Sequence, residues 1–233
     1  MPIVYKIPFA IYVFPCYLES MSNKSENLSD TIYNLLKAQI LDGKLKGGEK
    51  IPEETLAKQF GVSRTPIREA VRRLSEFGLV SIKPRCYAEV TTITEKEASD
   101  IAYVRIRLEC LAVDLITPQS LDKNIRTLAR CAAECQFALD VGDRALSFEQ
   151  DSMFHSELVK TSENSALFNL YEHLGAKIQQ LRITQNLYGI ALKDYTIQHE
   201  QIMTLLREGK KKECKVLLYQ HVMHTPYPED LVL

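Results

Sequence analysis

Three histidines and one aspartate in the C-terminal half of the sequence have the residue types and spacing of a metal site. Asp151 and His155, in QDSMFHSELV, lie four residues apart, so a helix places both on one face about a turn apart. His199 and His221 each lie about eleven residues from Lys210, in the polar break REGKKKE. If the flanking helices form an antiparallel hairpin, both imidazoles lie at the same height. This set suits a divalent transition metal such as Zn, Ni, Mn or Fe.

The same four side chains have a simpler interpretation, as hydrogen-bonded core or surface residues without a metal. A site that binds a metal would differ from this metal-free cluster in its net charge. One carboxylate and three neutral imidazoles around a divalent ion leave a charge of about +1, which attracts an anion.

Residues 61–74, GVSRTPIREAVRRL, carry a different chemistry, with four arginines beside core aliphatics. At about 100° per residue, Arg64, Arg68 and Arg72 form one basic stripe with Thr65 at its edge. Arg73 points about 180° away from Arg64, toward solvent or a structural ion pair. The opposite arc is apolar and would be buried, with Ile67, Ala70, Val71, Leu74 and Phe77. A helix of this kind faces either solvent or phosphate.

The segments around the arginines predict a winged helix-turn-helix. Residues 28–43 form an amphipathic pattern, and EETLAKQF, residues 53–60, forms a short helix before a turn at Gly61. Ser63 is placed to cap the arginine helix, which ends at Gly78. The runs LVSI and AEVTTI, separated by KPRCY, then predict a small β-hairpin wing. In such a fold the N-terminal end of the second helix meets base edges, where arginine can bind guanine through two hydrogen bonds.

The remainder of the chain predicts an all-α antiparallel bundle, so the fold is mostly α. A helix begins after Thr94, with Glu97 placed to complete a capping box. Further helical patterns cover residues 121–141, 143–161, 164–188, 191–208 and 210–224, joined by short polar breaks. The predicted domains are a DNA-binding domain at 28–91 and a ligand-binding and dimerisation domain at 94–225.

Charge and cysteine usage agree with this division. The formal net charge is −1, yet Lys58 to Arg85 holds seven basic and two acidic residues. Residues 91–233 hold 16 basic and 20 acidic residues. A basic segment ahead of a mildly acidic body fits a nucleic-acid module joined to another domain. The six cysteines form no CxxC pair, which indicates free thiols in a reducing cytoplasm.

Residues 1–27 are expected to be a poorly structured or misassigned N-terminal extension. The apolar opening is interrupted by Pro8 and Pro15 and is too short for a membrane span. Met21 begins MSNKSENLSD, a polar lead-in typical of a translation start. We therefore expect translation to begin at Met21, and no membrane association.

The stretch LAKQFGVSRTPIREAVRRLSEFGLVSI resembles the winged helix of the GntR family of bacterial transcription regulators. The helical C-terminal half is similar to the FadR-like branch with an FCD-type domain, so the resemblance extends from Leu28 to about Thr225. It implies base and phosphate contacts from Arg64 and Arg68 and a backbone contact from Thr65. Tyr87 stands where the family typically has a wing-tip glycine. The predicted DNA-binding residues are Ser63, Arg64, Thr65, Arg68, Arg72 and Arg85.

The resemblance to the FCD type also implies Asp151, His155, His199 and His221 as metal ligands, since DSMFH and TSENSAL match that pattern. Members of the family typically bind small carboxylates at the metal. Arg105 matches a recurrent arginine that would pair with the effector's acid group. Arg105 and Glu109 are also spaced for an ordinary helix ion pair.

The expected protein is therefore a cytoplasmic, homodimeric, ligand-responsive transcription regulator, a repressor rather than an activator, and not an enzyme. Its partners would be a palindromic double-stranded DNA operator and a small carboxylate effector. Two rival functions remain open. One is a metalloenzyme with its site in the bundle, and the other is a pure metal sensor in which the ion itself is the signal.

Overall fold

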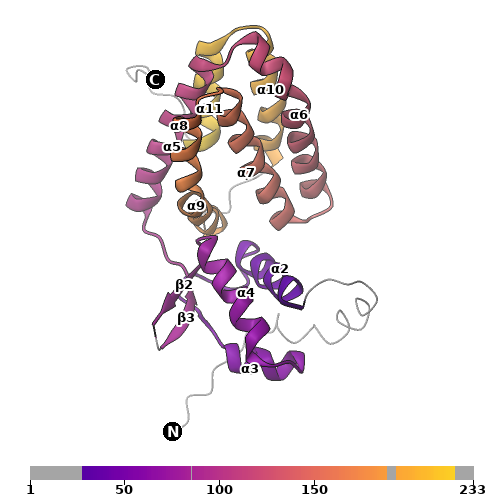
Figure 1. Cartoon of the computed structure of the whole chain (residues 1–233), viewed down its shortest axis with the longest axis vertical. Coiled ribbons are helices and arrows are strands. Elements are labelled where there is room, and N and C mark those ends of the chain that lie inside the picture. Colours follow the sequence, from indigo (N-terminus) through magenta and orange to yellow (C-terminus); the bar gives the residue numbers. More distant parts are fainter. Residues whose placement is uncertain (1–27, 85, 188–192, 224–233) are drawn as a thin grey trace. The chain divides into compact units, whose positions relative to one another are not determined.

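The structure of the protein, a computed structural model, describes residues 28–84, 86–187 and 193–223 (Figure 1). The expectations for residues 1–27 and for Arg85 fall outside these residues. The chain divides between Thr92 and Ile93 into two compact units, each with its own core. Among the helices that the structure describes, none combines the length and the apolar character needed to cross a membrane.

The described part of the N-terminal unit, from Leu28 onward, contains three helices and a three-stranded antiparallel sheet in the order β1-β3-β2. Its elements are α2 (Leu28–Leu41), β1 (Lys50–Ile51), α3 (Glu53–Phe60), α4 (Arg64–Glu76), β2 (Val80–Lys83) and β3 (Tyr87–Val90). The predicted hairpin is present as β2 and β3. The sequence pattern predicts no strand at residues 50–51, yet Lys50 and Ile51 pair with Glu89 and Ala88. Two residues carry too little periodicity to reveal a strand, and only the pairing with β3 makes one.

The core of this unit holds α4 in place and leaves its arginine stripe outside. Ile67 and Leu74 of α4 are fully buried, as is Ile32 of the neighbouring α2. Gly61 ends α3 with φ of 65°, a left-handed conformation that suits glycine and produces the turn into α4. Ser63 occupies the N-cap position of α4, but its side chain makes no capping hydrogen bond. The expected position of Ser63 at the N-cap is therefore confirmed, but the expected hydrogen bond from its side chain was wrong.

Seven helices lie in the part of the C-terminal unit that the structure describes. They are α5 (Glu95–Leu115), α6 (Pro118–Asp140), α7 (Arg144–Thr161), α8 (Ser165–His173), α9 (Gly175–Leu187), α10 (Lys193–Arg207) and α11 (Lys211–Met223). The Thr94–Glu97 capping box is present at the start of α5. The single helix predicted at 164–188 is two helices. The backbone N–H of Leu174 donates to the carbonyl of Tyr171, three residues earlier, and this closes α8. The apolar pattern continues across this break, so periodicity alone did not show it.

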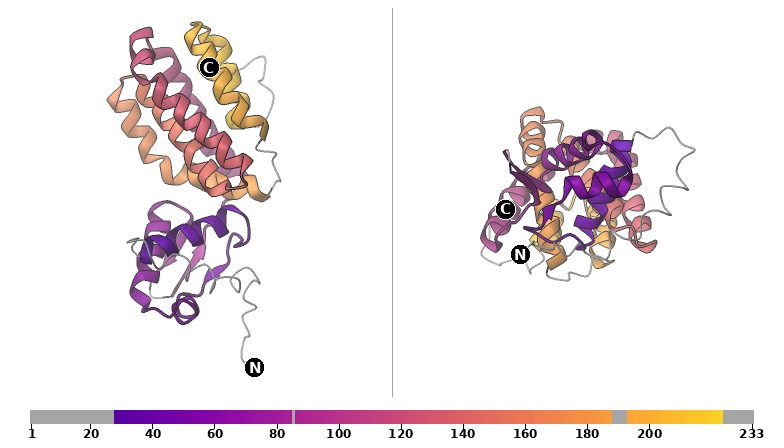
Figure 2. Two further views of the ribbon diagram at one scale, coloured as in Figure 1. Left: turned by 90° about the vertical axis from the view of Figure 1, so that its right-hand side faces the viewer. Right: turned by 90° about the horizontal axis from the view of Figure 1, so that it is seen from below.

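Five of these helices form a closed ring around one core. In that ring α5 packs on α7 and α11, α6 packs on α7 and α10, and α10 packs on α11 (Figure 2, left). The shorter α8 and α9 lie against α5. The buried core includes Ile106, Leu128, Phe154, Leu158, Ile202 and Leu218. Side chains on the inward faces of α7, α10 and α11 are therefore brought together although they are distant in sequence.

Candidate metal centre and DNA-reading helix

The ring brings Asp151 and His155 of α7, His199 of α10 and His221 of α11 to one point. One ligand atom from each lies within 4.8 Å of the others, and all four residues are buried. Asp151 Oδ1 lies 3.2 Å from Nε2 of His199 and 3.6 Å from Nε2 of His221. The corresponding distance to Nε2 of His155 is 3.7 Å. The structure thus brings together all four residues that the sequence predicted as a group, and their role as ligands stays a prediction.

Four of the six separations among these atoms are close to those of atoms that share one small cation. With metal–nitrogen bonds of about 2.0–2.1 Å, ligands in a tetrahedral arrangement lie about 3.3–3.4 Å apart. Nε2 of His155 and Nε2 of His221 are 3.0 Å apart, and the three contacts to Asp151 bracket the ideal value. The donor set therefore fits a divalent transition metal, with three imidazoles and one carboxylate.

The outer nitrogens of two imidazoles are held by other side chains. Nδ1 of His155 donates to Glu109 Oε2 at 2.9 Å, and Nδ1 of His221 donates to Gln198 Oε1 at 3.0 Å. These bonds assign the proton to Nδ1 and leave the Nε2 lone pairs directed at the cluster. Two lone pairs at 3.0 Å repel unless a proton or a cation lies between them. His199 makes no hydrogen bond through either ring nitrogen among the described residues.

Burial sets the protonation of the histidines. It lowers the pKa of His221 to about 3 and also lowers the pKa of His199. Burial acts in the same direction on His155, but the Glu109 and Asp151 carboxylates together outweigh it and the pKa ends above its ordinary value. Neutral imidazoles are the form that binds a metal. His199 and His221 are therefore available to an ion at neutral pH without first losing a proton.

Glu109 contacts the four-residue cluster through His155, and the sequence pattern did not predict this contact. Besides His155, it accepts hydrogen bonds from Nε of Arg105 at 2.8 Å and from the Tyr171 hydroxyl at 2.7 Å. Burial raises its pKa, but His155 and Arg105 outweigh burial and the pKa is well below its usual range. The Arg105–Glu109 ion pair was one of the two expectations for Arg105, and it is present. Its i, i+4 spacing was the only sequence signal, and nothing in the sequence pointed to Tyr171 or Gln198.

The arginine stripe of α4 lies on the surface of the N-terminal unit. The side chains of Arg64, Arg68 and Arg72 are 55%, 67% and 62% exposed. Arg64 pairs with Glu54 at 2.8 Å, and Arg68 pairs with Glu53 at 3.2 Å. Ser63 and Thr65 are exposed beside them. The stripe is therefore accessible, but acidic residues of α3 neutralise part of it.

The other arginine of α4 has a structural partner. Arg73 pairs with Asp30 of α2 and lies 4.3 Å above the ring of Tyr33. Arg72 pairs with Glu76 on its own helix. The expectation that Arg73 belongs to solvent or to a structural ion pair is met by the second alternative.

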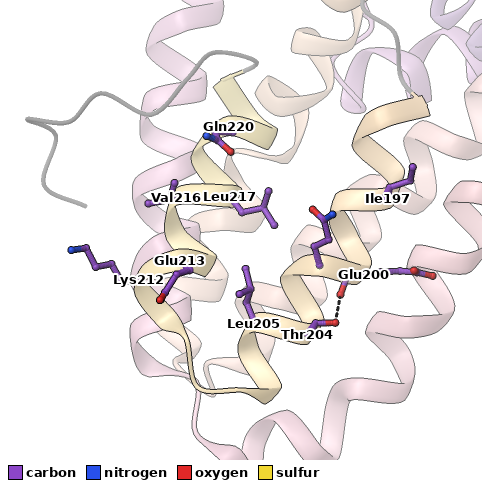
Figure 3. A pocket seen from close by; sticks show the side chains of 10 residues that line it. Ile197, Glu200, Thr204, Leu205, Lys212, Glu213, Val216, Leu217 and Gln220 are labelled. Atoms are coloured by element: carbon purple, nitrogen blue, oxygen red, sulfur yellow. Dashed lines mark hydrogen bonds between the residues drawn. The ribbon is translucent and has the colours of Figure 1, made fainter.

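A groove of about 930 Å³ lies on the outer side of α10 and α11 (Figure 3). Its walls mix apolar side chains with Glu200, Lys212 and Glu213. Glu200 and Gln220 line the groove, while their sequence neighbours His199 and His221 are buried on the inner faces. The groove is therefore separate from the four-residue cluster, and it contains none of those four side chains.

Comparison with known proteins agrees with the two units. Residues 28–88 match the family of bacterial regulatory proteins named gntR, and residues 100–224 match the FCD domain. The HTH-type transcriptional regulator YdhC of Bacillus subtilis strain 168 is 36% identical over 198 residues, which cover 82% of this chain and 84% of YdhC. A protein of Paenarthrobacter nicotinovorans named as a probable D-xylose utilization operon transcriptional repressor is 25% identical, over 84% of this chain and 85% of its own length.

The solved structure of McbR/YncC from E. coli has the same fold. It superposes with a TM-score of 0.58 at 25% identity, covering 85% of this chain and 95% of McbR. A winged helix-turn-helix unit, an FCD-type bundle and these relatives lead to one conclusion. The chain belongs to the GntR family of DNA-binding bacterial transcription regulators, with an FCD domain as its C-terminal unit.

Proposed function

We propose that this chain is a cytoplasmic, homodimeric repressor that binds a palindromic operator and responds to a small carboxylate held at a metal. The convergence of Asp151, His155, His199 and His221 on one buried point carries this proposal. A metabolite acts on DNA binding only if it binds the competent and incompetent states differently, and tenfold discrimination corresponds to about 1.4 kcal/mol. Repression is the activity named for the relative from Paenarthrobacter nicotinovorans.

In the proposed DNA complex, the N-terminal end of α4 enters the major groove. Arg64 and Arg68 would contact base edges and nearby phosphates, while Thr65 and Ser63 bond to the backbone. Arg72 lies further along the helix and would meet a phosphate, and the sequence predicts the same for Arg85. The exposure of the stripe supports these roles, because its ion pairs with Glu53 and Glu54 are solvated and can be exchanged for phosphate.

The buried cluster would hold a divalent ion, which supplies a Lewis-acid position for a carboxylate oxygen. Arg105 and Glu109 offset each other, so a divalent ion with Asp151 leaves a charge of about +1 when the histidines are neutral. A small anion would neutralise this charge. Arg105 would add to the attraction through the guanidinium donors that Glu109 does not use.

The first experiment is elemental analysis of the purified native protein beside His199→Ala and His221→Ala variants. We expect about one equivalent of transition metal in the native protein and little in either variant. His173→Ala is the matched control, since His173 is exposed on α8 and should leave the metal content unchanged. A native protein that holds no metal, and binds none on addition, would remove the metal from this proposal while leaving DNA binding intact.

One observation favours the metal-sensor alternative enough to test it directly. Arg105 is buried against Glu109 at 2.8 Å, so its charge is already balanced before any effector arrives. If the ion is the signal, operator affinity measured by fluorescence anisotropy will change with free metal alone. If the ion anchors an effector, affinity will change only when a small carboxylate is also present.

A further inference from the structure

One face of α5 carries an exposed apolar row that no described element covers. Val104, Leu111 and Leu115 are 48%, 46% and 38% exposed, and Leu108 lies half-buried between them. The spacing of four, three and four residues places all four on one side of the helix. This α5 row runs for about 16 Å at 1.5 Å per residue.

Such a row is unusual on a monomer surface. Single exposed leucines need no explanation, but a continuous apolar strip marks a contact site. The inner edge of the row is anchored, since Leu108 packs against the small core that α8 completes through Leu167 and Tyr171. Leu170 of α8, 54% exposed, adds another apolar side chain on a helix that packs against α5. The backbone beneath the row is therefore rigid and needs no rearrangement to form an interface.

The charges beside the row favour a second copy of this chain as the partner. Arg107 and Asp114 are both exposed and lie seven residues apart along the same edge. When two α5 helices pair antiparallel with the two-fold axis between residues 110 and 111, Arg107 faces Asp114 of the partner subunit, and the reverse contact repeats it. An axis near residue 107 would instead oppose Asp100 to Asp114 of the partner subunit. The charges thus disfavour an axis near residue 107, and the centre of the apolar row, which spans residues 104–115, favours the axis between residues 110 and 111.

We propose that the α5 row is the face through which two copies of this chain pair, antiparallel, with Leu111 next to the two-fold axis. This inference assigns a surface to the homodimer in the proposed function and rests on that dimer. Asp114 already contacts Lys215 at 3.0 Å, yet its side chain is 47% exposed and keeps acceptor positions for Arg107 of the partner subunit. Leucine contacts would supply the association energy, and the charge pairs would favour this register.

The groove between α10 and α11 is the competing surface (Figure 3). Its apolar side chains alternate with Glu200, Gln201, Lys212, Glu213 and Gln220, so it lacks a continuous apolar strip. Ile197 in that groove is 51% exposed, close to the 46% of Leu111. Ile197→Glu is therefore a matched control for Leu111→Glu, because each places a carboxylate at a half-exposed apolar position of a helix.

The test is the molar mass of the full-length chain and both variants by light scattering, over a range of concentrations. We expect the native protein and Ile197→Glu to be dimers, and Leu111→Glu to dissociate at least 100-fold more readily. A dimeric Leu111→Glu beside a monomeric Ile197→Glu would overturn the α5 assignment in favour of the groove. A native protein that is monomeric throughout would refute the dimer itself, while the metal measurement would still stand separately.

Cross-linking guards against a Leu111→Glu variant that fails to fold. In a chain with Cys16 and Cys86 changed to Ser, Leu111→Cys places two thiols beside the axis, about 1.5 Å apart along the helices. Val104→Cys places them about 20 Å apart. Oxidation should give a covalent dimer for Leu111→Cys only. A dimer in solution that cross-links through residue 104, or through neither position, would overturn the register.

Discussion

Two ion pairs of the same length behave oppositely in this molecule. Arg64 and Glu54 on the proposed DNA-reading surface are 2.8 Å apart, and so are Arg105 and Glu109 in the bundle. The first pair is 55% and 62% exposed, whereas the second is 4% and 0% exposed. Water screens the first pair, so it contributes little to stability and can be exchanged for another partner. Removing one member of the second leaves an uncompensated charge inside the protein.

This difference fits the function that we propose for each region. A surface that reads DNA has to release its own acidic partners when phosphate arrives, so its arginines are paired but solvated. A buried site that is to hold an ion needs its ligands fixed in advance. Glu109 fixes the His155 ring and is itself fixed by Arg105 and Tyr171. Exposure, more than distance, therefore separates an exchangeable contact from a permanent one.

The largest expected effect is on stability. Glu109→Ala should lower the free energy of unfolding by about 3–5 kcal/mol, because Arg105 is left buried without a partner. Glu54→Ala removes a pair of equal length and should change it by less than about 0.5 kcal/mol. Urea unfolding of both variants measures the contrast. Similar losses in the two variants would show that burial does not distinguish these pairs.

Metal removal should have the next largest effect. At a free metal concentration of about 100 times Kd, a bound ion stabilises the folded state by about 2.7 kcal/mol. A chelator should therefore lower the melting temperature of the native protein, and His155→Ala should be insensitive to the chelator. Thermal unfolding with and without chelator measures this difference. An equal fall of the melting temperature in both proteins would mean that the chelator does not act through a metal at His155.

DNA binding should depend on α4 by a smaller amount. Arg64→Ala should weaken binding to a selected operator by about 1–3 kcal/mol without changing stability. Arg130→Ala is the control, because Arg130 of α6 is 57% exposed and also sits beside a glutamate. Anisotropy titrations with labelled operator measure both variants. Unchanged affinity in Arg64→Ala would remove this residue from the proposed contacts.

The smallest expected effect tests whether Arg64 exchanges its ion pair with Glu54 for a contact to DNA phosphate. Glu54→Gln should strengthen operator binding by up to about 1 kcal/mol, because Arg64 no longer has to leave a carboxylate. The gain should shrink as salt rises, since salt screens the exposed pair. Glu134→Gln, on α6, should show no gain. Weaker operator binding in Glu54→Gln would mean that Glu54 positions Arg64 for DNA instead of competing with the phosphates.

Local patterns were enough to find most of the elements. The apolar periodicity of α2 through α7, the Thr94–Glu97 capping box and the turn at Gly61 are all written in neighbouring residues. The errors share one cause. The strand β1 forms only by pairing with β3, the break at Leu174 interrupts a continuous apolar pattern, and Ser63 reaches no backbone donor. Each depends on contacts or backbone geometry that spacing does not report.

The sequence by itself determined the fold class, the arginine stripe and the identities of the four clustered side chains. Helix geometry places Asp151 and His155 on one face. The equal distance of His199 and His221 from Lys210, together with the family resemblance, adds the other two. Only the tertiary structure decided what those groups meet. Glu109 reaches His155 across 46 residues and Tyr171 across 62. The tertiary structure also decided which arginine–glutamate pair is buried and therefore permanent. Exposure depends on the packing of the whole ring of helices, and no local pattern records it.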